Sequence, residues 1–293
     1  NELVDIHNEV SAAYQLVGQF SLAIEHATIA LRQAEQIDND LLRAQALQRL
    51  TVAYYEWDRW SDATNDGEQM IAIAARTSFS QQNHYRWGLL ALAVALTRMG
   101  RRDRADQIAQ QLEDLPIILE SQYVGLFRGR LQLARGNFAE AEQIWRDALK
   151  VTAGRHSYPA LLAELAELGA RQDRRDLTDE FGARAVDIGE RSGARKPLAQ
   201  ALRARGIVAL ADRRLADADR DLADALQRFQ EFETRWEEAR THYVLASLWR
   251  RQDNADAAQR ELEGALHLFE QVHAVRDIAR AKAALAGGEI RLP

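Results

Sequence analysis

Small and apolar residues recur along the chain at helical spacing, in stripes that begin with alanine. Residues i, i+4 and i+7 of a helix share one face, so each stripe predicts an amphipathic helix. The six stripes are Ala23/Ala27/Ala30, Ala63/Gly67/Met70, Ala105/Ala109/Leu112, Ala141/Trp145/Ala148, Ala218/Leu222/Ala225 and Ala258/Leu262/Ala265. Their first residues are 40, 42, 36, 77 and 40 residues apart, and 77 equals two repeats. The pattern therefore predicts seven copies of one helical unit.

Two further positions precede every stripe at a fixed distance. Five residues before the first alanine lie Gly18, Asp58, Gly100, Gly136, Arg213 and Asp253, which are mostly residue types that favour a tight turn. Twelve residues before it lie Ser11, Thr51, Ala93, Gly129, Gly206 and Ala246, all of them small. A small residue lets a facing helix approach closely. Each copy is thus predicted to be a helical hairpin whose two helices pack tightly.

The boundaries of the hairpins are marked by residues that begin helices. Pro116, Pro159 and Pro197 fall where a first helix should start, a position that tolerates proline. The repeats are predicted at about 2–37, 40–77, 80–114, 117–153, 157–192, 196–232 and 234–272, with a C-terminal capping helix at 275–286. No linker interrupts them, which predicts one domain over 1–293.

The fifth copy is the least regular one. A stripe that begins at Leu177 continues correctly to Phe181 but then meets Arg184, where other copies have a small or apolar residue. The alternative stripe Leu177/Phe181/Ala185/Ile188 is equally helical. The hairpin is predicted there, and its register stays open.

This order of residues resembles the tetratricopeptide repeat (TPR). In the fourth copy the resemblance is carried by Gly129, Leu133, Gly136, Phe138, Ala141, Trp145 and Ala148. The family implies an all-α fold, a right-handed TPR superhelix (α-solenoid) of about seven helical hairpins plus the capping helix. The usual period is about 34 residues, so longer helices or turns are expected here. Such long repeats are similar to those in C-terminal regions of bacterial MalT/LuxR-like ATPase regulators and related signalling proteins.

Composition narrows the class of partner. The formal net charge is −6, with 44 acidic and 38 basic residues, which disfavours direct nucleic acid contact. There is no cysteine, which excludes disulfides and thiolate metal sites and is consistent with the cytoplasm. No apolar run reaches the length of a membrane span. The chain begins at Asn1 within a helical pattern, so we expect a segment of a longer protein.

The resemblance implies where a ligand would bind, since the first helices of a TPR array line a concave channel. The channel positions lie at i−6, i−3, i+1 and i+4 from the small residue of each first helix. Only Asp5 is acidic among the positions read in six copies, which indicates an acidic or carboxylate-bearing protein or peptide, because arginine pairs with carboxylates in a bidentate manner. The candidate binding residues are Gln48, Arg49, Tyr55, Trp87, Arg98, Tyr123, Arg130, Arg203, Arg240 and Tyr243.

The remaining conspicuous residues are interpreted as structural. Trp145 and Trp249 are expected in the core, and Glu164 and Glu167 on an exposed helix face. Histidine spacing predicts no metal site, no motif predicts a cofactor, and no nucleophile–base pair predicts an enzyme. The sequence thus favours a non-enzymatic peptide-binding scaffold. The alternative is a small-molecule sensor that controls an attached catalytic or DNA-binding domain, and the oligomeric state is not predicted.

Overall fold

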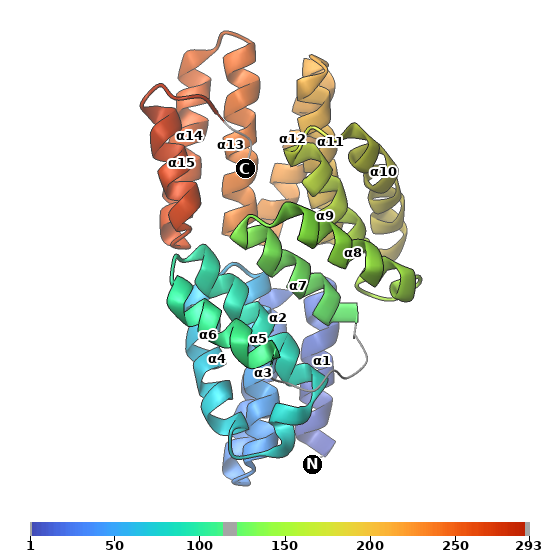
Figure 1. Ribbon diagram of the computed structural model, residues 1–293, viewed down its shortest axis with the longest axis vertical. Helices are drawn as coiled ribbons and strands as arrows, with labels where there is room; N and C mark the ends of the chain where they lie inside the picture. Colours follow the sequence, from blue (N-terminus) through green and yellow to red (C-terminus); the bar gives the residue numbers. More distant parts are fainter. Residues whose placement is uncertain (1, 114–121, 291–293) are drawn as a thin grey trace. The chain divides into compact units, whose positions relative to one another are not determined.

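The described part of the chain, residues 2–113 and 122–290 of a computed structural model, is built from α-helices and one short 3-10 helix, without strands (Figure 1). It divides into two compact units, Asn1–Ala148 and Leu149–Pro293. Each unit is described here by itself. The single domain predicted over 1–293 stays a prediction.

The first unit contains four helical hairpins. Its helices are α1 (Glu2–Leu16), α2 (Phe20–Gln36), α3 (Asp40–Glu56), α4 (Trp60–Ala74), α5 (Asn83–Arg98), α6 (Arg102–Glu113), α7 (Gln122–Arg135) and most of α8 (Phe138–Thr152), with a 3-10 helix η1 (Ser78–Gln81) before α5. The first helices α1, α3, α5 and α7 pack side by side in that order. Asn39 caps α3 by accepting a hydrogen bond from the backbone N–H of Leu42. The helix start predicted at Pro116 lies outside the described residues.

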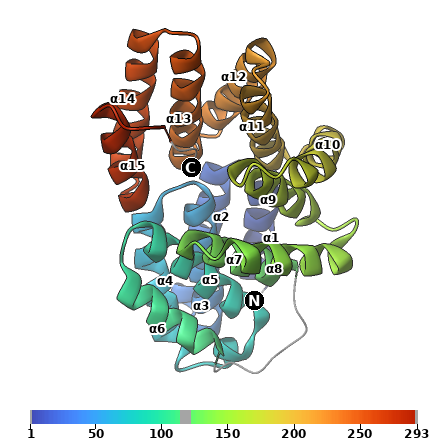
Figure 2. The same ribbon diagram turned by 45° about the horizontal axis from the view of Figure 1, so that its top comes forward.

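The second unit contains three hairpins and a final helix. Its helices are α9 (Tyr158–Arg171), α10 (Arg175–Ser192), α11 (Arg195–Ala211), α12 (Leu215–Glu231), α13 (Arg235–Arg251), α14 (Ala255–Gln271) and α15 (Val275–Leu285). Pro159 and Pro197 lie in the first turns of α9 and α11, as predicted. Figure 2 shows α15 packed along α14, which confirms the capping helix.

Long helices are the main reason why the repeat exceeds the usual period. Six helices, α2, α3 and α11 to α14, contain 17 residues each. Every predicted hairpin turn contains its residue in the left-handed region, including Arg213 at φ 60°. Several turns between hairpins use the same geometry, as at Asp38, Glu233 and His273. The connection from α4 to α5 is longer and contains η1, so it adds to the length of its repeat together with the helices.

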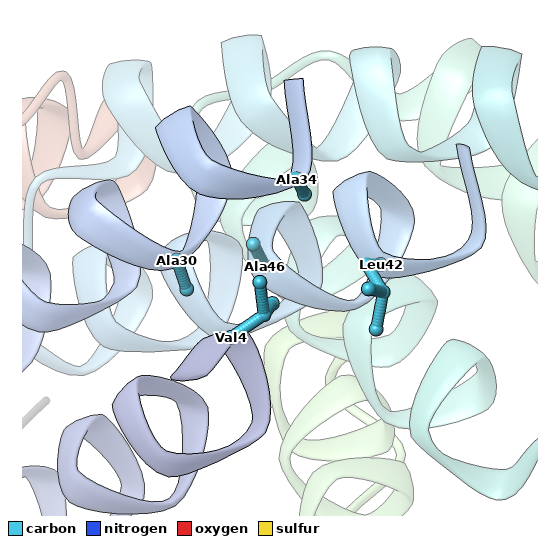
Figure 3. Close-up of a cluster of buried hydrophobic side chains, with 5 residues drawn as sticks. All are labelled: Val4, Ala30, Ala34, Leu42 and Ala46. Atoms are coloured by element: carbon cyan, nitrogen blue, oxygen red, sulfur yellow. The ribbon is translucent and has the colours of Figure 1, made fainter. Parts of the chain in front are cut away.

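The predicted stripes form the contacts between helices. Ala23, Ala63, Ala141 and Ala218 are all fully buried. In the first unit, Figure 3 shows small side chains of α2 and α3 meeting a valine of α1; the cluster consists of Val4, Ala30, Ala34, Leu42 and Ala46. Because these side chains are short, the three helices come close together, which confirms the prediction made from the stripes.

Glycine permits the closest approach inside the fourth hairpin. A Cβ placed on Gly129 would lie 2.1 Å from Nε1 of Trp145. The indole N–H donates a 3.0 Å hydrogen bond to the backbone oxygen of Leu126 on the facing helix. Trp145 is thus held flat against α7, in the core as expected.

The structure establishes the register of the fifth hairpin. Asp173 is the left-handed turn residue, with φ 54°, so the stripe begins five residues later at Thr178 and continues with Gly182 and Ala185. The hydroxyl of Thr178 donates to the backbone oxygen of Ala166 at 3.2 Å. The first register considered from the sequence, which continued to Arg184, was therefore one residue early, whereas Leu177, Phe181 and Ala185 of the alternative stripe are all buried. This correction moves Glu167 to the position after the small residue, which is one of the predicted channel positions.

Candidate functional site

The predicted binding residues occur in both units. Gln48, Arg49 and Tyr55 lie on α3, Trp87 and Arg98 on α5, and Tyr123 and Arg130 on α7, all in the first unit. Arg203 lies on α11, and Arg240 and Tyr243 on α13, in the second unit. The structure brings the members of each set together within their own unit.

Stacked aromatic rings join α5 to α7 in the first unit. The rings of Trp87 and Tyr123 are nearly parallel, at an angle of 8°, with their centroids 4.3 Å apart. Phe127 meets the edge of Trp87 at 6.1 Å and lies 5.3 Å from Tyr55 on α3. Offset and edge-on rings of this kind are attractive beyond the area they bury. They form a rigid apolar surface across three first helices.

Arg130 and Arg98 lie against this aromatic surface. The Arg130 guanidinium is 5.1 Å from the Phe127 ring and forms a 2.5 Å ion pair with Glu56. Arg98 lies over the rings of Tyr55 and Trp60, at 5.5 and 5.2 Å. Cation–π contacts hold both side chains in place. Arg130 is thus already neutralised by a carboxylate of its own chain.

Arg49 is in a different situation. Its side chain is only 10% exposed, and among the described residues its one carboxylate partner is Glu9 of α1, at 3.2 Å, whose side chain is 77% exposed. Its guanidinium also lies 5.8 Å above the Trp87 ring. Burial lowers the pKa of Arg49, and Glu9 offsets this only in part. A buried cation with a single solvent-exposed partner is suited to binding a second anion.

Buried polar atoms that lack a hydrogen-bond partner among the described residues lie on the helix of Arg49 and on the two first helices packed against it. They include Oδ1 of Asn8 on α1, Nε2 of Gln48 on α3 and Nε1 of Trp87 on α5. Asn8 and Gln48 occupy the same i−3 position on helices that pack together. We refer to Asn8, Gln48, Arg49, Trp87 and Tyr123 as the polar band. Buried polar groups normally have partners, so this band is the candidate site.

The second unit contains a buried network of charges, which we call the ionic cluster: Glu167 of α9, Arg203 of α11, and Glu237 and Arg240 of α13. Arg203 is completely buried and bonds to both glutamates. Arg240 also pairs with both, at 3.2 Å to Glu167 and 3.0 Å to Glu237. Arg203 donates further to the backbone oxygen of Glu237 at 2.9 Å.

The charges of this cluster stabilise one another. Burial alone would raise the pKa of Glu237, but Arg203 and Arg240 lower it. Burial alone would likewise lower the pKa of Arg240, but Glu167 and Glu237 raise it. Glu237 and Arg240 therefore stay charged because opposite charges lie beside them.

This cluster corrects two readings of the sequence. The face carrying Arg203 and Arg240 is not poor in acid, since Glu167 and Glu237 lie on it and neutralise both arginines. Glu164 and Glu167 were expected on an exposed helix face, but both are buried, with 5% and 4% of their surface exposed. Tyr243 is buried as well. The turn residue Asp173 is the sequence signal that would have placed Glu167 correctly.

The structure also bears on the expectations for Trp249, for metal ligands and for membrane-spanning helices. Trp249 is only half-buried, in contrast to the core position expected for it. Among residues 2–113 and 122–290, no three metal-ligating side chains gather. No helix within the described part of the chain is both long and apolar enough to cross a membrane.

Comparisons with known proteins show the fold. No family model matches the chain, and no curated protein sequence matches it. It is similar to the solved structure of a Rap protein complexed with Competence and Sporulation Factor, with 14% identity, a TM-score of 0.67, and coverage of 91% of this chain and 74% of the other. It is also similar to the Rap conjugation gene regulator of plasmid pLS20 in complex with the Phr* peptide, with 14% identity, a TM-score of 0.69, and coverage of 92% and 74%.

A third similar structure contains no ligand. The apo form of RapI matches with 14% identity and a TM-score of 0.51 over 83% of this chain and 72% of that one. The helical-repeat fold predicted from the TPR resemblance is thereby confirmed.

Proposed function

We propose that this chain is a non-enzymatic, peptide-binding scaffold of a regulatory protein, and that the polar band of the first unit is its binding site. The observation that carries the proposal concerns the described residues: Arg49 has there a single, solvent-exposed carboxylate partner, and it lies beside polar atoms of Gln48 and Trp87 that have no hydrogen-bond partner. A ligand with both a carboxylate and main-chain amides would satisfy all three.

Each residue of the band has a chemical role in this proposal. Arg49 receives a carboxylate, either the C-terminus of the peptide or an acidic side chain. The Nε2 amide of Gln48 donates to a main-chain carbonyl, and Oδ1 of Asn8 accepts from a main-chain N–H. The stacked rings of Trp87 and Tyr123 hold an apolar side chain. The preference for carboxylates expected from the sequence is kept, but Arg203 and Arg240 no longer contribute to it.

The similar structures support the proposal through their fold. One is a complex with the Phr* peptide and is described as a conjugation gene regulator. A helical-repeat fold of this kind can therefore hold a peptide in a regulatory protein. We extend peptide binding by a helical-repeat fold to the present chain. A MalT/LuxR-like ATPase regulator remains one proposal for the intact protein, and a cytoplasmic location goes with it.

The test is a binding screen with paired peptides. Fluorescein-labelled short peptides, each made with a free C-terminal carboxylate and as an amide, are titrated against the protein and followed by fluorescence anisotropy. We expect a subset of the free acids to bind and their amides to bind at least about tenfold more weakly, because a charge-assisted hydrogen bond is lost. The variant Arg49→Gln should remove this difference between acid and amide.

Two controls make the assignment specific. Arg32→Gln changes an exposed arginine on α2 and should leave binding unchanged. Trp87→Phe keeps an aromatic ring at this position but removes the indole N–H, so it should weaken peptide binding less than Arg49→Gln does. Equal binding of acids and amides by the unmodified protein and Arg49→Gln would show that Arg49 is not in the site. Binding of compounds from a metabolite panel, with no peptide bound, would favour the small-molecule sensor instead.

A further inference from the structure

Arg171 differs from the arginines of the ionic cluster because no ion pair with a carboxylate is formed by it among the described residues. It is the last residue of α9, a place where the helix dipole favours a cation. The side chain is half-buried, and its Nε lies away from solvent with no hydrogen-bond partner among the described residues. A donor held in this way normally finds an acceptor, in the protein or in a ligand.

Three helices of the second unit place further charges around Arg171. One turn earlier on α9 lies Glu167, which bonds to Arg240 of α13. On α15, Asp277 accepts from the indole N–H of Trp236 at 2.9 Å and from Arg280 at 3.2 Å. The capping helix thus carries Asp277 and Arg280 to the end of α9 and the start of α13. Arg171 lies where these elements converge.

A second donor without a partner occurs in the same neighbourhood. Nε of Arg240 is buried and has no acceptor in the part of the chain that the structure describes, although another nitrogen of its guanidinium bonds to Glu167 and Glu237. Burial, together with the nearby positive charge of Arg240, lowers the pKa of Arg171 to about 9. A bound anion would relieve both the repulsion between the two cations and the lack of acceptors.

We propose that Arg171, assisted by Arg280 and by Nε of Arg240, binds the carboxylate group of a small ligand beneath the capping helix α15. All of these residues belong to the second unit, and the proposal does not rest on peptide binding at the polar band. A planar carboxylate matches the fork of an arginine, with one oxygen for each of two N–H groups.

The neighbouring acids favour a carboxylate over a phosphate. Glu167 and Asp277 both interact electrostatically with Arg171. Their negative charges repel any anion that approaches, and they repel a doubly charged phosphate about twice as strongly as a singly charged carboxylate. This repulsion offsets the additional attraction that a doubly charged anion gains from the arginines, so we propose a planar, singly charged carboxylate as the ligand.

The test follows the arginine Nε–H resonances by NMR, with acetate and inorganic phosphate as the probes at constant ionic strength set by sodium chloride. Arg171→Gln identifies the resonance of Arg171 by its disappearance. We expect acetate to shift this resonance along a saturable curve, and phosphate to bind at least tenfold more weakly. Acetate should also raise the melting temperature of the protein, and Arg171→Gln should abolish that rise.

Two variants show which group binds. Arg175→Gln changes a nearby exposed arginine of α10 and should leave acetate binding intact. Asp277→Asn removes a negative charge while keeping an acceptor for Trp236, so it should strengthen phosphate binding more than acetate binding. Absence of a saturable shift up to about 100 mM acetate would overturn the site. Tighter binding of phosphate than of acetate by the unmodified protein would overturn the choice of carboxylate.

Discussion

Arginines at neighbouring positions of the first helices have opposite surroundings in the two units. In the first unit, Arg49 faces one carboxylate that is largely exposed to water. In the second unit, Arg203 is fully buried and bonds to two buried glutamates. An arginine in this part of a first helix can therefore serve either as a binding group or as a structural ion. What decides between them is the acid content of the adjacent first helices.

The different surroundings of Arg49 and Arg203 also predict different contributions to the stability of the fold. A buried ion pair loses its hydration, so its members depend on each other, and removing one leaves an uncompensated charge. An exposed partner such as Glu9 keeps its hydration and contributes little. We therefore expect the second unit to be sensitive to loss of single charges, and the polar band of the first unit to be tolerant.

The largest effect is expected for Glu167→Ala. Arg203 and Arg240 would each lose a carboxylate within a buried environment, so the free energy of unfolding should fall by about 3–5 kcal/mol. The matched change in the first unit, Glu9→Ala, should cost less than about 1 kcal/mol because Glu9 is exposed. Urea unfolding followed by circular dichroism measures both values. Equal costs for the two variants would remove the distinction between the units.

A smaller effect is expected where glycines occupy the same repeat position in the two units. Gly129→Ala would press a methyl group against the rigid Trp145 indole, 2.1 Å away, and should cost about 2–3 kcal/mol. Gly206→Ala meets Leu222 at 2.8 Å, a side chain that can rotate, and should cost about 1 kcal/mol.

Gly264→Ala is the control for both substitutions. No atom lies within 4 Å of its added Cβ, so the change should stabilise α14 by up to about 1 kcal/mol. Melting temperatures compared across the three variants test this order. A larger loss at Gly206 than at Gly129 would show that the second unit is packed more rigidly than the first.

His242 should make the stability of the second unit depend on pH. Burial alone would lower the pKa of this histidine, but hydrogen bonds with Glu238 and Glu261 raise it to about 9. A raised pKa stabilises the fold at pH values below the ordinary value of about 6.5, and this contribution disappears as pH rises through about 9. We expect roughly 2 kcal/mol to be lost over that interval. His242→Gln should flatten the dependence, as measured by urea unfolding at about pH 6, 7.5 and 9.

The regular parts of the fold were predictable because they depend on short-range patterns. Turn residues such as Gly18 and Asp58 adopt left-handed backbone, and the first residues of the stripes, such as Ala63 and Ala218, are buried. Close helix packing requires small residues at fixed spacing, and this requirement is visible in one sequence. The all-α repeat fold and the capping helix follow from it.

The site was predictable only in part, because it depends on which charges meet between repeats. Thr178 stands where other stripes have alanine, so the register of α10 stayed open, and nothing in the sequence moved Glu167 from the exposed face expected for it to the buried position that it occupies. Glu237 lies one turn before the four channel positions considered, and Glu56 lies one residue past them. Neither entered the count of acids. Ion pairs between helices far apart in sequence have no local signal, whereas the stacking of Trp87 on Tyr123 joins two residues that were both predicted.

The smallest change in the free energy of unfolding is expected for substitution of Arg49. Because burial lowers the pKa of Arg49, its charged form is less favourable in the folded protein than in water, so the charge opposes folding at neutral pH. Arg49→Met should therefore change the free energy of unfolding by no more than about 1 kcal/mol, in either direction.

Arg203→Met, the matched change, leaves Glu167 and Glu237 uncompensated and should cost about 3–5 kcal/mol. A buried charge that contributes nothing to stability is consistent with a role in binding. If urea unfolding instead shows a loss of about 2 kcal/mol or more for Arg49→Met, then Arg49 supports the fold as Arg203 does, and the polar band loses the group proposed to bind the carboxylate.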